Sequence, residues 1–439
     1  MKKKMLALTM AAVMAASLTA CGSQSGSDTT TAADTAAAPQ ASAGANASGT
    51  LDASGETITI WMPTFAAADG PISDKDFWER ELKALSDETG CNVNVEIIPW
   101  DSYEEKYLTG ISSNEGPDVG YMYMEMFYDY IKQEQIADIS PYFTDEEKSN
   151  YIYYDLGNMQ GGQYGLPVVV GNPRILIGNK AILEEAGITQ MPATWDEFVE
   201  DCKLIMEKTD AAPFTQDWGN PHYGSLNEIF WPYFWSAGGE IVDEEDNLTI
   251  DSPAGLEATQ FLYDLRNVNG ILSDSCTAVT DVESVFKEGN TAFVVIASSN
   301  ALRITDIDWD YTTVLQAPAG GSKTFVAADC LVMLNSAKNK ELAAKAIKLI
   351  TSTDVMSRFH KEVSSQPPIT TDEEFEGDTR FNELYMSESE KLQSLPVFEG
   401  AAALYDALYK NLQSMMLGDM TPEEVLTSTT DYYNSNIKE

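Results

Sequence analysis

The sequence TITI occupies residues 57–60 and NVNVEII occupies residues 92–98, with DKDFWERELKALSDET between them at 74–89. Alternation with a period of two is typical of a strand that has one buried face. The middle segment has apolar side chains at helical spacing, and Gly90 follows it as a helix-ending residue. Strand, helix and strand at this spacing predict a βαβ unit, which pairs its strands in parallel. The chain is therefore predicted to be an α/β protein.

Later segments continue this mixed pattern. TWDE at 194–197 and TPEE at 421–424 are capping boxes, which predict helix starts. AFVVIA at 292–297 is a continuous apolar run that suits a strand buried on both faces, and 341–350 predicts an amphipathic helix. Neither an internal repeat nor a second low-complexity linker interrupts the body. We therefore expect a compact body with interwoven lobes.

The first 20 residues have the pattern of a secretory signal peptide. Three lysines at 2–4 precede an apolar run, and LTAC follows at 18–21. The apolar run is too short to cross the ~30 Å hydrocarbon core as a helix. Leu-x-Ala-Cys resembles the lipobox of bacterial lipoproteins, which implies that Cys21 is acylated and becomes the mature N-terminus. The alternative is a plain secretory signal in which the cysteine stands by chance.

Residues 22–55 consist of Ser, Thr, Ala, Gly and Asp with hardly any bulky apolar side chain. Such a segment buries too little surface to offset its conformational entropy, so disorder is expected. A flexible coil of roughly 34 residues spans on the order of 30 Å. We therefore expect residues 21–55 to be a lipid-anchored disordered linker that holds the body near a membrane.

The 439-residue chain is strongly acidic, with 69 acidic and 27 basic residues and a formal net charge of −42. This charge repels phosphate groups, which argues against nucleic acid or an anionic lipid surface as a partner. The two histidines and five cysteines show neither a C-x-x-C pair nor metal-ligand spacing, so we expect no metal and no cofactor. Cys91, Cys202, Cys276 and Cys330 are expected to be buried, and one disulfide among them remains open.

The sequence contains no clear catalytic motif. The G-x-S-x-G and G-x-x-x-x-G-K-[ST] patterns are absent, and two histidines leave little scope for a Ser-His or Cys-His pair. SVFK at 284–287 matches S-x-x-K without its partner motifs and is interpreted as an ordinary helix. The paired carboxylates of a glycoside hydrolase are invisible in a sequence with this many acids. A surface-anchored glycoside hydrolase therefore stays open as the alternative to a binding protein.

An unusually dense aromatic cluster, FWPYFW, occupies residues 230–235, and His222 and Tyr223 precede it. Aromatic faces pack against the C–H faces of sugars, while nearby amides and carboxylates bond the hydroxyl groups. Trp231 and Trp235 are therefore candidate walls of a ligand-binding cleft. The alternative is that these rings belong to the core.

Several segments, taken in their order along the chain, resemble the family 1 extracellular solute-binding proteins of ABC importers, the group that includes maltose-binding protein. The resemblance runs from about Thr57 to the C-terminus. A single match would be weak, but the joint order of the segments is specific. They are GPDV at 116–119, YGLP at 164–167, NK at 179–180, EAG at 185–187, PATWDEF at 192–198, WP at 231–232, GG at 238–239, GNTAF at 289–293 and SAKN at 336–339.

The resemblance implies two α/β lobes, built like those of periplasmic binding proteins, that close around a ligand like a hinged clamp. The expected first lobe is 56–170 plus 330–356, and the expected second lobe is 171–329 plus 357–439. The chain is expected to cross between the lobes near 170–173, 326–330 and 352–360.

The resemblance also suggests ligand-binding residues, by correspondence with maltose-binding protein. Glu125 matches an acidic ligand contact after Gly-Pro-Asp, and Tyr405 matches an aromatic platform on a late helix. Asn172, with Arg174 beside it, stands at the first crossover where that protein has a carboxylate. Glu228 falls beside an aromatic contact and would accept hydrogen bonds from hydroxyl groups. The predicted set is completed by the two tryptophans Trp231 and Trp235.

Two departures from maltose-binding protein make maltose itself a doubtful ligand. Met122 replaces an aromatic residue after Gly-Pro-Asp, and Ser299 replaces a tryptophan after the apolar run at 292–297. Four of these predicted contacts also have a purely structural alternative. These are a solvated rim acid for Glu125, a core stripe for Tyr405, and bracing of the hinge for Asn172 and Arg174.

The anchor, the linker and the ordered segments together predict a non-enzymatic, monomeric lipoprotein on the outer face of a cytoplasmic membrane. We expect it to bind a carbohydrate, in particular an oligosaccharide, and to pass it to the membrane subunits of an ABC import permease. An adhesin or sensor without a small ligand is a further alternative.

Overall fold

The computed structural model describes residues 51–438 apart from 69, 244, 314, 375–380, 382–383 and 386–388. The predicted signal peptide, the lipidation site Cys21 and most of the predicted linker lie outside these residues. The described body starts ahead of the expected linker boundary at residue 55, because Ala53 is buried and its N–H donates to the Thr89 carbonyl at 2.8 Å. Among the described helices, none has both the length and the apolar character that crossing a membrane requires.

The first lobe is built on a five-stranded sheet. In spatial order its strands are β2 (Asn92–Ile98), β1 (Thr57–Pro63), β3 (Val119–Met122), β12 (Ala327–Met333) and β6 (Leu166–Gly171). β1 pairs in parallel with β2 along its whole length, with Ile58 opposite Val93 and Ile60 opposite Val95. This pairing confirms the predicted βαβ unit. β12, which comes late in the chain, pairs antiparallel with both β3 and β6.

The connecting helix α1 (Asp74–Thr89) has its expected bounds for local reasons. The Ser73 hydroxyl accepts the Asp76 N–H at its start, and Gly90 at its end has φ 75°, a left-handed conformation that glycine adopts readily. The small pair β4 (Asn158–Met159) and β5 (Gly162–Gln163) also belongs to this lobe. Its other helices are α2 (Tyr103–Ser113), α3 (Met124–Lys132), α4 (Asp145–Ser149), α12 (Lys340–Ile350) and α13 (Thr353–Glu362).

The second lobe is built on a four-stranded sheet. In spatial order its strands are β10 (Trp309–Thr312), β7 (Arg174–Asn179), β9 (Thr291–Ala297) and β8 (Ala212–Thr215). β7 is antiparallel to both neighbours, and β8 is parallel to β9. Every residue of β9 is buried, since Val294 and Ile296 face one hydrophobic cluster and Phe293 faces the other. The predicted strand at 292–297 is therefore confirmed.

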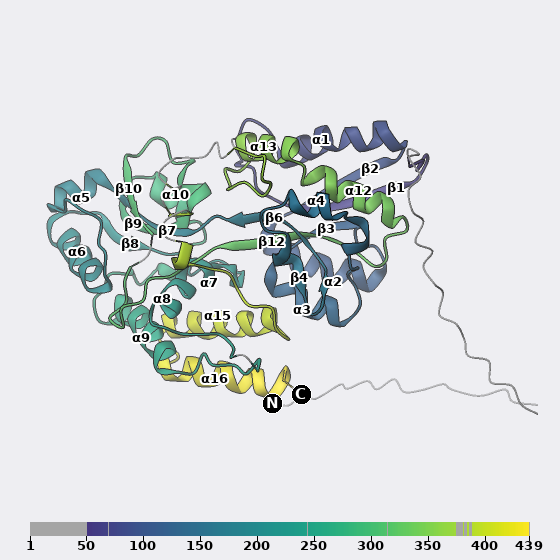
Figure 1. Ribbon diagram of the computed structural model, residues 1–439. Coiled ribbons are helices and arrows are strands. Elements are labelled where there is room, and N and C mark those ends of the chain that lie inside the picture. The colour runs from purple at the N-terminus through teal and green to yellow at the C-terminus, as the bar shows by residue number, and fades with distance from the viewer. Residues whose placement is uncertain are drawn as a thin grey trace, which may run out of the picture. The chain divides into compact units, whose positions relative to one another are not determined.

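Helices cover the second sheet, and α15 and α16 lie side by side in Figure 1, with α9 at their left end. The capping box at Thr421 is complete, whereas at Thr194 the Glu197 carboxylate accepts the N–H of Ala193 instead. The helices are α5 (Lys180–Ala186), α6 (Trp195–Lys208), α7 (Leu226–Ile229), α8 (Trp231–Ser236), α9 (Pro253–Asn267), α10 (Val282–Lys287), α11 (Ser298–Ala301), α15 (Ala401–Leu417) and α16 (Pro422–Asn436).

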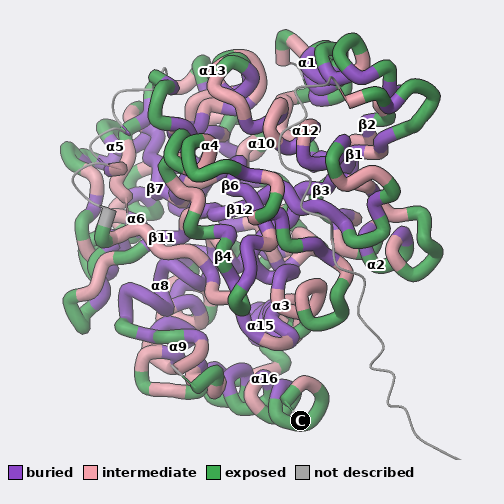
Figure 2. The backbone as a smooth tube through the Cα atoms, turned by 45° about the vertical axis from the view of Figure 1, so that its right-hand side comes forward, coloured by how far each residue is buried: buried purple, intermediate pink, exposed green. Residues whose placement is uncertain are grey.

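The chain passes between the lobes where β6 leads into β7 through Asn172 and Pro173, and where β11 (Thr324–Phe325) leads into β12 through Val326. Figure 1 shows the five-stranded sheet on the right of the body and the four-stranded sheet on the left. Figure 2 shows buried residues along β6, β7 and β12. These positions agree with the first two expected crossovers.

The segment 352–360, where we expected the third crossover, instead forms most of α13 and stays with the first lobe. The Phe359 ring lies 5.2 Å from that of Phe65 and 5.3 Å from that of Trp78, centroid to centroid. This aromatic contact holds α13 on the first lobe. The chain reaches the second lobe later, between Thr370, which bridges to first-lobe Tyr151, and Phe381, which packs against Tyr311.

Candidate functional site

A cavity of about 660 Å³ lies between the two lobes. First-lobe residues reach it from the loop after β1, from the end of β2, from the junction of β3 with α3, and from β12. Second-lobe residues reach it from the first crossover, from the loop around 217–228, from 280–283 and from 296–303. Cavities of this size ordinarily hold small organic molecules. Because its lining comes from both lobes, a molecule bound in it contacts both.

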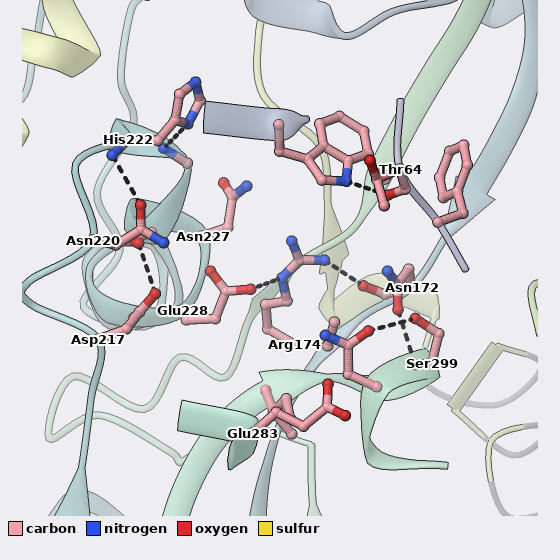
Figure 3. Close-up of a pocket in the computed structure, with 18 of the residues that line it drawn as sticks. Thr64, Asn172, Arg174, Asp217, Asn220, His222, Asn227, Glu228, Glu283 and Ser299 are labelled. Carbon is pink, nitrogen blue, oxygen red and sulfur yellow. Dashed lines mark hydrogen bonds and ion pairs between the residues drawn. The ribbon is translucent and has the colours of Figure 1, made fainter. Parts of the chain in front are cut away.

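Arg174, the first residue of β7, lies at the centre of the labelled side chains in Figure 3. Its Nε donates to Glu228 Oε1 at 2.5 Å and its Nη1 donates to the Asn172 carbonyl at 2.9 Å. The guanidinium carbon also lies 4.7 Å from the ring centroid of Phe325. These contacts fix the guanidinium plane, while Nη2 has no hydrogen-bond partner among the described residues. Arg174 can therefore present a fixed donor to a ligand.

Asn172 shapes the crossover itself. Its φ of 55° is left-handed, a conformation that asparagine tolerates better than most residues. Its side-chain oxygen accepts the Ser299 N–H at 3.0 Å and the Ser298 hydroxyl at 3.3 Å. These bonds tie the crossover to the start of α11 and use the oxygen of the amide. Its nitrogen has no partner among the described residues and lines the cavity.

Two buried carboxyl groups form the first-lobe wall. Glu125 lies in the first turn of α3, and Asp329 lies on β12 at an irregularity in its pairing with β6. Tyr121 donates its hydroxyl to Asp329 at 2.5 Å. Burial, reinforced by the charges of Asp329 and Glu104, raises the pKa of Glu125 to about 8. Burial also raises the pKa of Asp329 to about 7, against the opposing effect of the Tyr121 hydrogen bond.

The loop before α7 forms the second-lobe wall through short-range hydrogen bonds. Asp217 accepts the Ser225 hydroxyl at 2.8 Å, and the Asn220 side chain accepts the His222 N–H at 2.9 Å. His222 Nδ1 accepts the Gly224 N–H at 2.9 Å, so its proton is on Nε2, which has no partner among the described residues. Burial lowers the pKa of His222, which keeps the ring neutral. This loop therefore offers the cavity both donors and acceptors.

Glu228 closes this wall beside Arg174 (Figure 3). Burial raises the pKa of Glu228 to about 7, although the charge of Arg174 opposes the shift. The ion pair is largely removed from solvent, with side-chain exposures of 13% for Arg174 and 18% for Glu228. Removing one partner would leave the other charge poorly compensated.

Trp100 supplies an aromatic surface at the cavity. It follows β2 directly after Pro99, and its Nε1 donates to the Thr64 carbonyl at 2.6 Å. The ring stands edge-to-face against Phe65 and Tyr121, yet the residue keeps 37% exposure. An oriented indole that stays partly exposed at the cavity is suited to pack against an apolar ring face of a ligand.

Two contacts join the lobes at the cavity. The hydroxyl of Tyr223, from the second lobe, donates to the Glu104 carboxyl on α2, which also accepts the Tyr123 hydroxyl at 2.6 Å. Arg303 Nη2, also from the second lobe, donates to the Phe65 carbonyl at 2.8 Å. The structure is therefore one in which the lobes are held together.

The lining offers a polar molecule both hydrogen-bonding groups and an apolar face. Carboxyl and amide groups supply acceptors, Arg174 supplies donors, and Trp100 supplies an apolar face. Within the part of the chain that the structure describes, no three His, Cys, Asp or Glu side chains are arranged to hold a metal ion. Cys91, Cys202, Cys276 and Cys330 are buried free thiols, which answers the disulfide question for the described body.

A model of the family of bacterial extracellular solute-binding proteins matches residues 69–357, more than half of the chain. The chain belongs to this family. The family match agrees with the resemblance found in the sequence, and the structure agrees with the two-lobed α/β architecture expected from that resemblance.

Individual solute-binding proteins are also similar over most of their length. The diacetylchitobiose-binding protein DasA of Streptomyces coelicolor is 28% identical over 372 residues, covering 80% of this chain and 79% of that protein. A Brucella abortus protein named only as a binding protein is 26% identical over 395 residues, covering 85% and 92%. The maltose-bound structure of T. maritima MalE3 superposes with a TM-score of 0.74 at 18% identity, covering 86% of this chain and 99% of that one.

The structure brings together four of the seven predicted ligand-binding residues. Glu125, Asn172, Arg174 and Glu228 all line the cavity of this solute-binding protein, from both lobes. Glu125 and Glu228 are distant in sequence from Asn172 and Arg174, and the fold brings them together at the crossover between β6 and β7. Whether each touches the ligand stays a prediction.

The structure places Trp231, Trp235 and Tyr405 in the core instead. Their exposures are 1%, 2% and 0%, and none of them lines the cavity. The Trp231 ring lies 5.0 Å from that of Tyr405 and 5.9 Å from that of Trp235, centroid to centroid. Rings with so little exposed surface have no face left for a ligand. The dense aromatic cluster therefore packs α8 against α15.

Sequence reasoning missed Trp100, Asp329 and Asn227 as lining residues. Trp100 carried a usable signal, because it directly follows a predicted parallel strand, and ligands gather at the carboxyl ends of such strands. Asp329 lies in the middle of an apolar strand, where a single acid is also a signal. Asn227 had none.

Proposed function

We propose that this solute-binding protein captures a carbohydrate outside the cytoplasm and delivers it to an ABC import permease. The observation that carries the proposal is the cavity between the lobes, whose wall combines carboxyl and amide groups with an oriented tryptophan. Hydroxyl groups of a sugar need acceptors and donors around the ring, and its C–H faces need an aromatic surface. Relatives named for diacetylchitobiose and maltose support the same ligand class.

The size of the cavity favours an oligosaccharide over a single small sugar. It reaches from Trp100 and Asp101 in the first lobe to Glu283 and Arg303 in the second. A ligand that touches both lobes stabilises their joined form by its differential affinity for that form. We expect an ABC permease to recognise the form in which the two lobes are joined.

The experiment is a calorimetric screen of mono- and oligosaccharides against the body beginning at residue 51. At least one sugar should bind saturably, and solution scattering should show a more compact protein in its presence. Binding of amino acids or metals but of no sugar would contradict the proposal. A scattering profile that stays unchanged at saturation would contradict the closure part alone.

We further propose that Cys21 is acylated and that residues 22–50 tether the body to the outer face of the cytoplasmic membrane. The lipobox-like LTAC sequence at 18–21 supports this. Palmitate labelling of cells that express the full chain should mark the protein, and Cys21→Ala should abolish the label and release the protein from the membrane. An unlabelled, freely secreted wild-type protein would contradict the anchor.

We also propose that the protein leaves its ligand chemically unchanged, as a monomer and without a cofactor. His222 Nδ1 is already used by a backbone N–H, which supports a role in binding rather than in catalysis. Chromatography of a bound oligosaccharide after long incubation should recover it intact. Release of shorter sugars, lost in a carboxyl-to-amide variant, would favour the glycoside hydrolase alternative.

A further inference from the structure

The charge of the cavity is strongly one-sided. Seven carboxyl groups and two guanidinium groups line it among the described residues. A wall of this charge repels anionic sugars such as uronates and sugar phosphates, and it attracts cations. The carboxyl groups belong to Asp101, Glu125, Asp217, Glu228, Asp281, Glu283 and Asp329, and the guanidinium groups to Arg174 and Arg303.

The two guanidinium groups are already engaged by the protein. Arg174 donates to Glu228 and to a backbone carbonyl, and Arg303 Nη2 donates to the Phe65 carbonyl. Several acids are engaged as well, because Asp281 caps α10 and Glu283 pairs with Lys287 at 2.6 Å. The imbalance is therefore concentrated on the first-lobe wall.

Glu125 is the buried carboxyl group on that wall that has no partner among the described residues. Its residue exposure is 7%, it lines the cavity, and apart from its own N–H no described residue forms a hydrogen bond or ion pair with it. Asp329 lies close enough for its charge to act on Glu125, and its one side-chain partner among the described residues is the Tyr121 hydroxyl. A buried carboxyl beside a second one is costly unless something compensates it. Among the described side chains, Arg174 is the cation whose charge acts on Glu125, but it forms its ion pair with Glu228 and none with Glu125.

We propose that the ligand is an amino sugar whose ammonium group binds at Glu125 and Asp329. The inference rests on the proposed function, since it names the class of carbohydrate that the same cavity takes. An ammonium group carries three donors and a positive charge, whereas a hydroxyl group offers one donor and no charge. Charge-assisted hydrogen bonds are roughly twice as strong as neutral ones. The second-lobe wall and Trp100 are left to bind the hydroxyl groups and a ring face.

The test compares sugars that differ only at the nitrogen-bearing carbon. Calorimetry would use chitobiose, N,N′-diacetylchitobiose and cellobiose, which share one linkage and carry amine, acetamide and hydroxyl groups. The monosaccharides glucosamine, N-acetylglucosamine and glucose form a second series. For any other neutral sugar that binds in the broader screen, its amino counterpart is measured too. We expect the amine to bind tighter than its acetamide and hydroxyl counterparts by on the order of tenfold.

Two variants locate the effect. Glu125→Gln keeps the shape and removes the carboxylate, so the preference for the amine should fall to near unity. Glu105→Gln makes the same change at an exposed position on α2 outside the cavity, and the preference should survive. Circular dichroism and cooperative urea unfolding show that both variants are folded.

The outcomes separate the two proposals. Neutral or acetylated sugars that bind as tightly as their amines overturn the amino-sugar inference and leave the carbohydrate function intact. A preference for the amine that persists in Glu125→Gln overturns the assignment of Glu125. Failure of every sugar, amino or neutral, overturns the proposed function and this inference with it.

Discussion

At the scale of single residues, the cavity is lined by side chains that are oriented by backbone groups. Asn172 is held by the Ser299 N–H, Trp100 by the Thr64 carbonyl and His222 by the Gly224 N–H. Backbone partners move less than side-chain partners, so each polar atom left over points in a fixed direction. Such preorganisation lowers the entropy that a ligand must overcome.

Arg174 should be irreplaceable by lysine. Lysine keeps the charge but has no planar fork, so it cannot bond Glu228 and the Asn172 carbonyl while also facing the cavity. We expect Arg174→Lys to weaken the affinity for the bound sugar roughly tenfold, measured by calorimetry. Arg80→Lys, on the outer face of α1, is the matched control and should bind like the wild type. Equal affinities for the two variants would contradict this role.

The stability of the empty protein should depend on pH through Glu125. Its folded-state pKa of about 8 lies above its ordinary value of 4.5, so between these values the native state holds more protons than the unfolded chain. The free energy of unfolding therefore falls as pH rises through this window. The free energy of unfolding, measured with urea, should fall less between about pH 5 and about pH 8 for Glu125→Gln than for the wild type. The difference between the two proteins isolates Glu125 from Glu104, Asp329, Glu228 and His222.

At the scale of elements, local signals account for the helix ends that were predicted correctly. α1 ends at Gly90 because a left-handed residue is needed there, and α16 begins at Thr421 because its hydroxyl accepts the Glu424 N–H. β9 is apolar throughout because hydrophobic clusters lie on both of its faces. The two helix signals involve only residues that are near in sequence. The third signal, the apolar run of β9, reflects the need to bury that strand on both faces.

Loss of the Thr421 cap should destabilise α16 measurably. Thr421→Ala removes the acceptor for the Glu424 N–H and leaves that donor without its partner. The free energy of unfolding should fall by about 1 kcal/mol. Ser435→Ala, exposed on the same helix, should change it by less than about 0.5 kcal/mol. Chemical denaturation of the two variants gives the comparison, and equal values would contradict the capping account.

At the scale of the whole molecule, contacts between the lobes set the balance between joined and separated forms. Tyr223 of the second lobe bonds Glu104 of the first, and Arg303 of the second lobe bonds Phe65 of the first. These contacts exist only when the lobes are together. They therefore favour the form in which a ligand touches both walls.

Tyr223→Phe should weaken this form without altering the cavity wall elsewhere. Loss of the hydroxyl removes one hydrogen bond to Glu104, worth about 1 kcal/mol, so sugar affinity should fall several-fold. Solution scattering of the sugar-free variant should show a more expanded protein than the wild type. Tyr432→Phe, exposed on α16, serves as the control and should change neither property. A scattering profile identical to that of the wild type would rule out a holding role for Tyr223.

Periodicity, caps and segment order in the sequence determined the α/β class, the βαβ unit, the buried strand β9 and the family, because these depend on neighbours along the chain. Only the tertiary structure decided which polar residues meet. Trp231 and Tyr405 satisfy any sequence criterion for a sugar platform, yet their rings are buried in the core, whereas Trp100 keeps 37% exposure. The third crossover was misplaced for the same reason, since the packing of Phe359 on Trp78 holds α13 in the first lobe. Contacts between distant segments are set by packing in three dimensions, which local patterns do not encode.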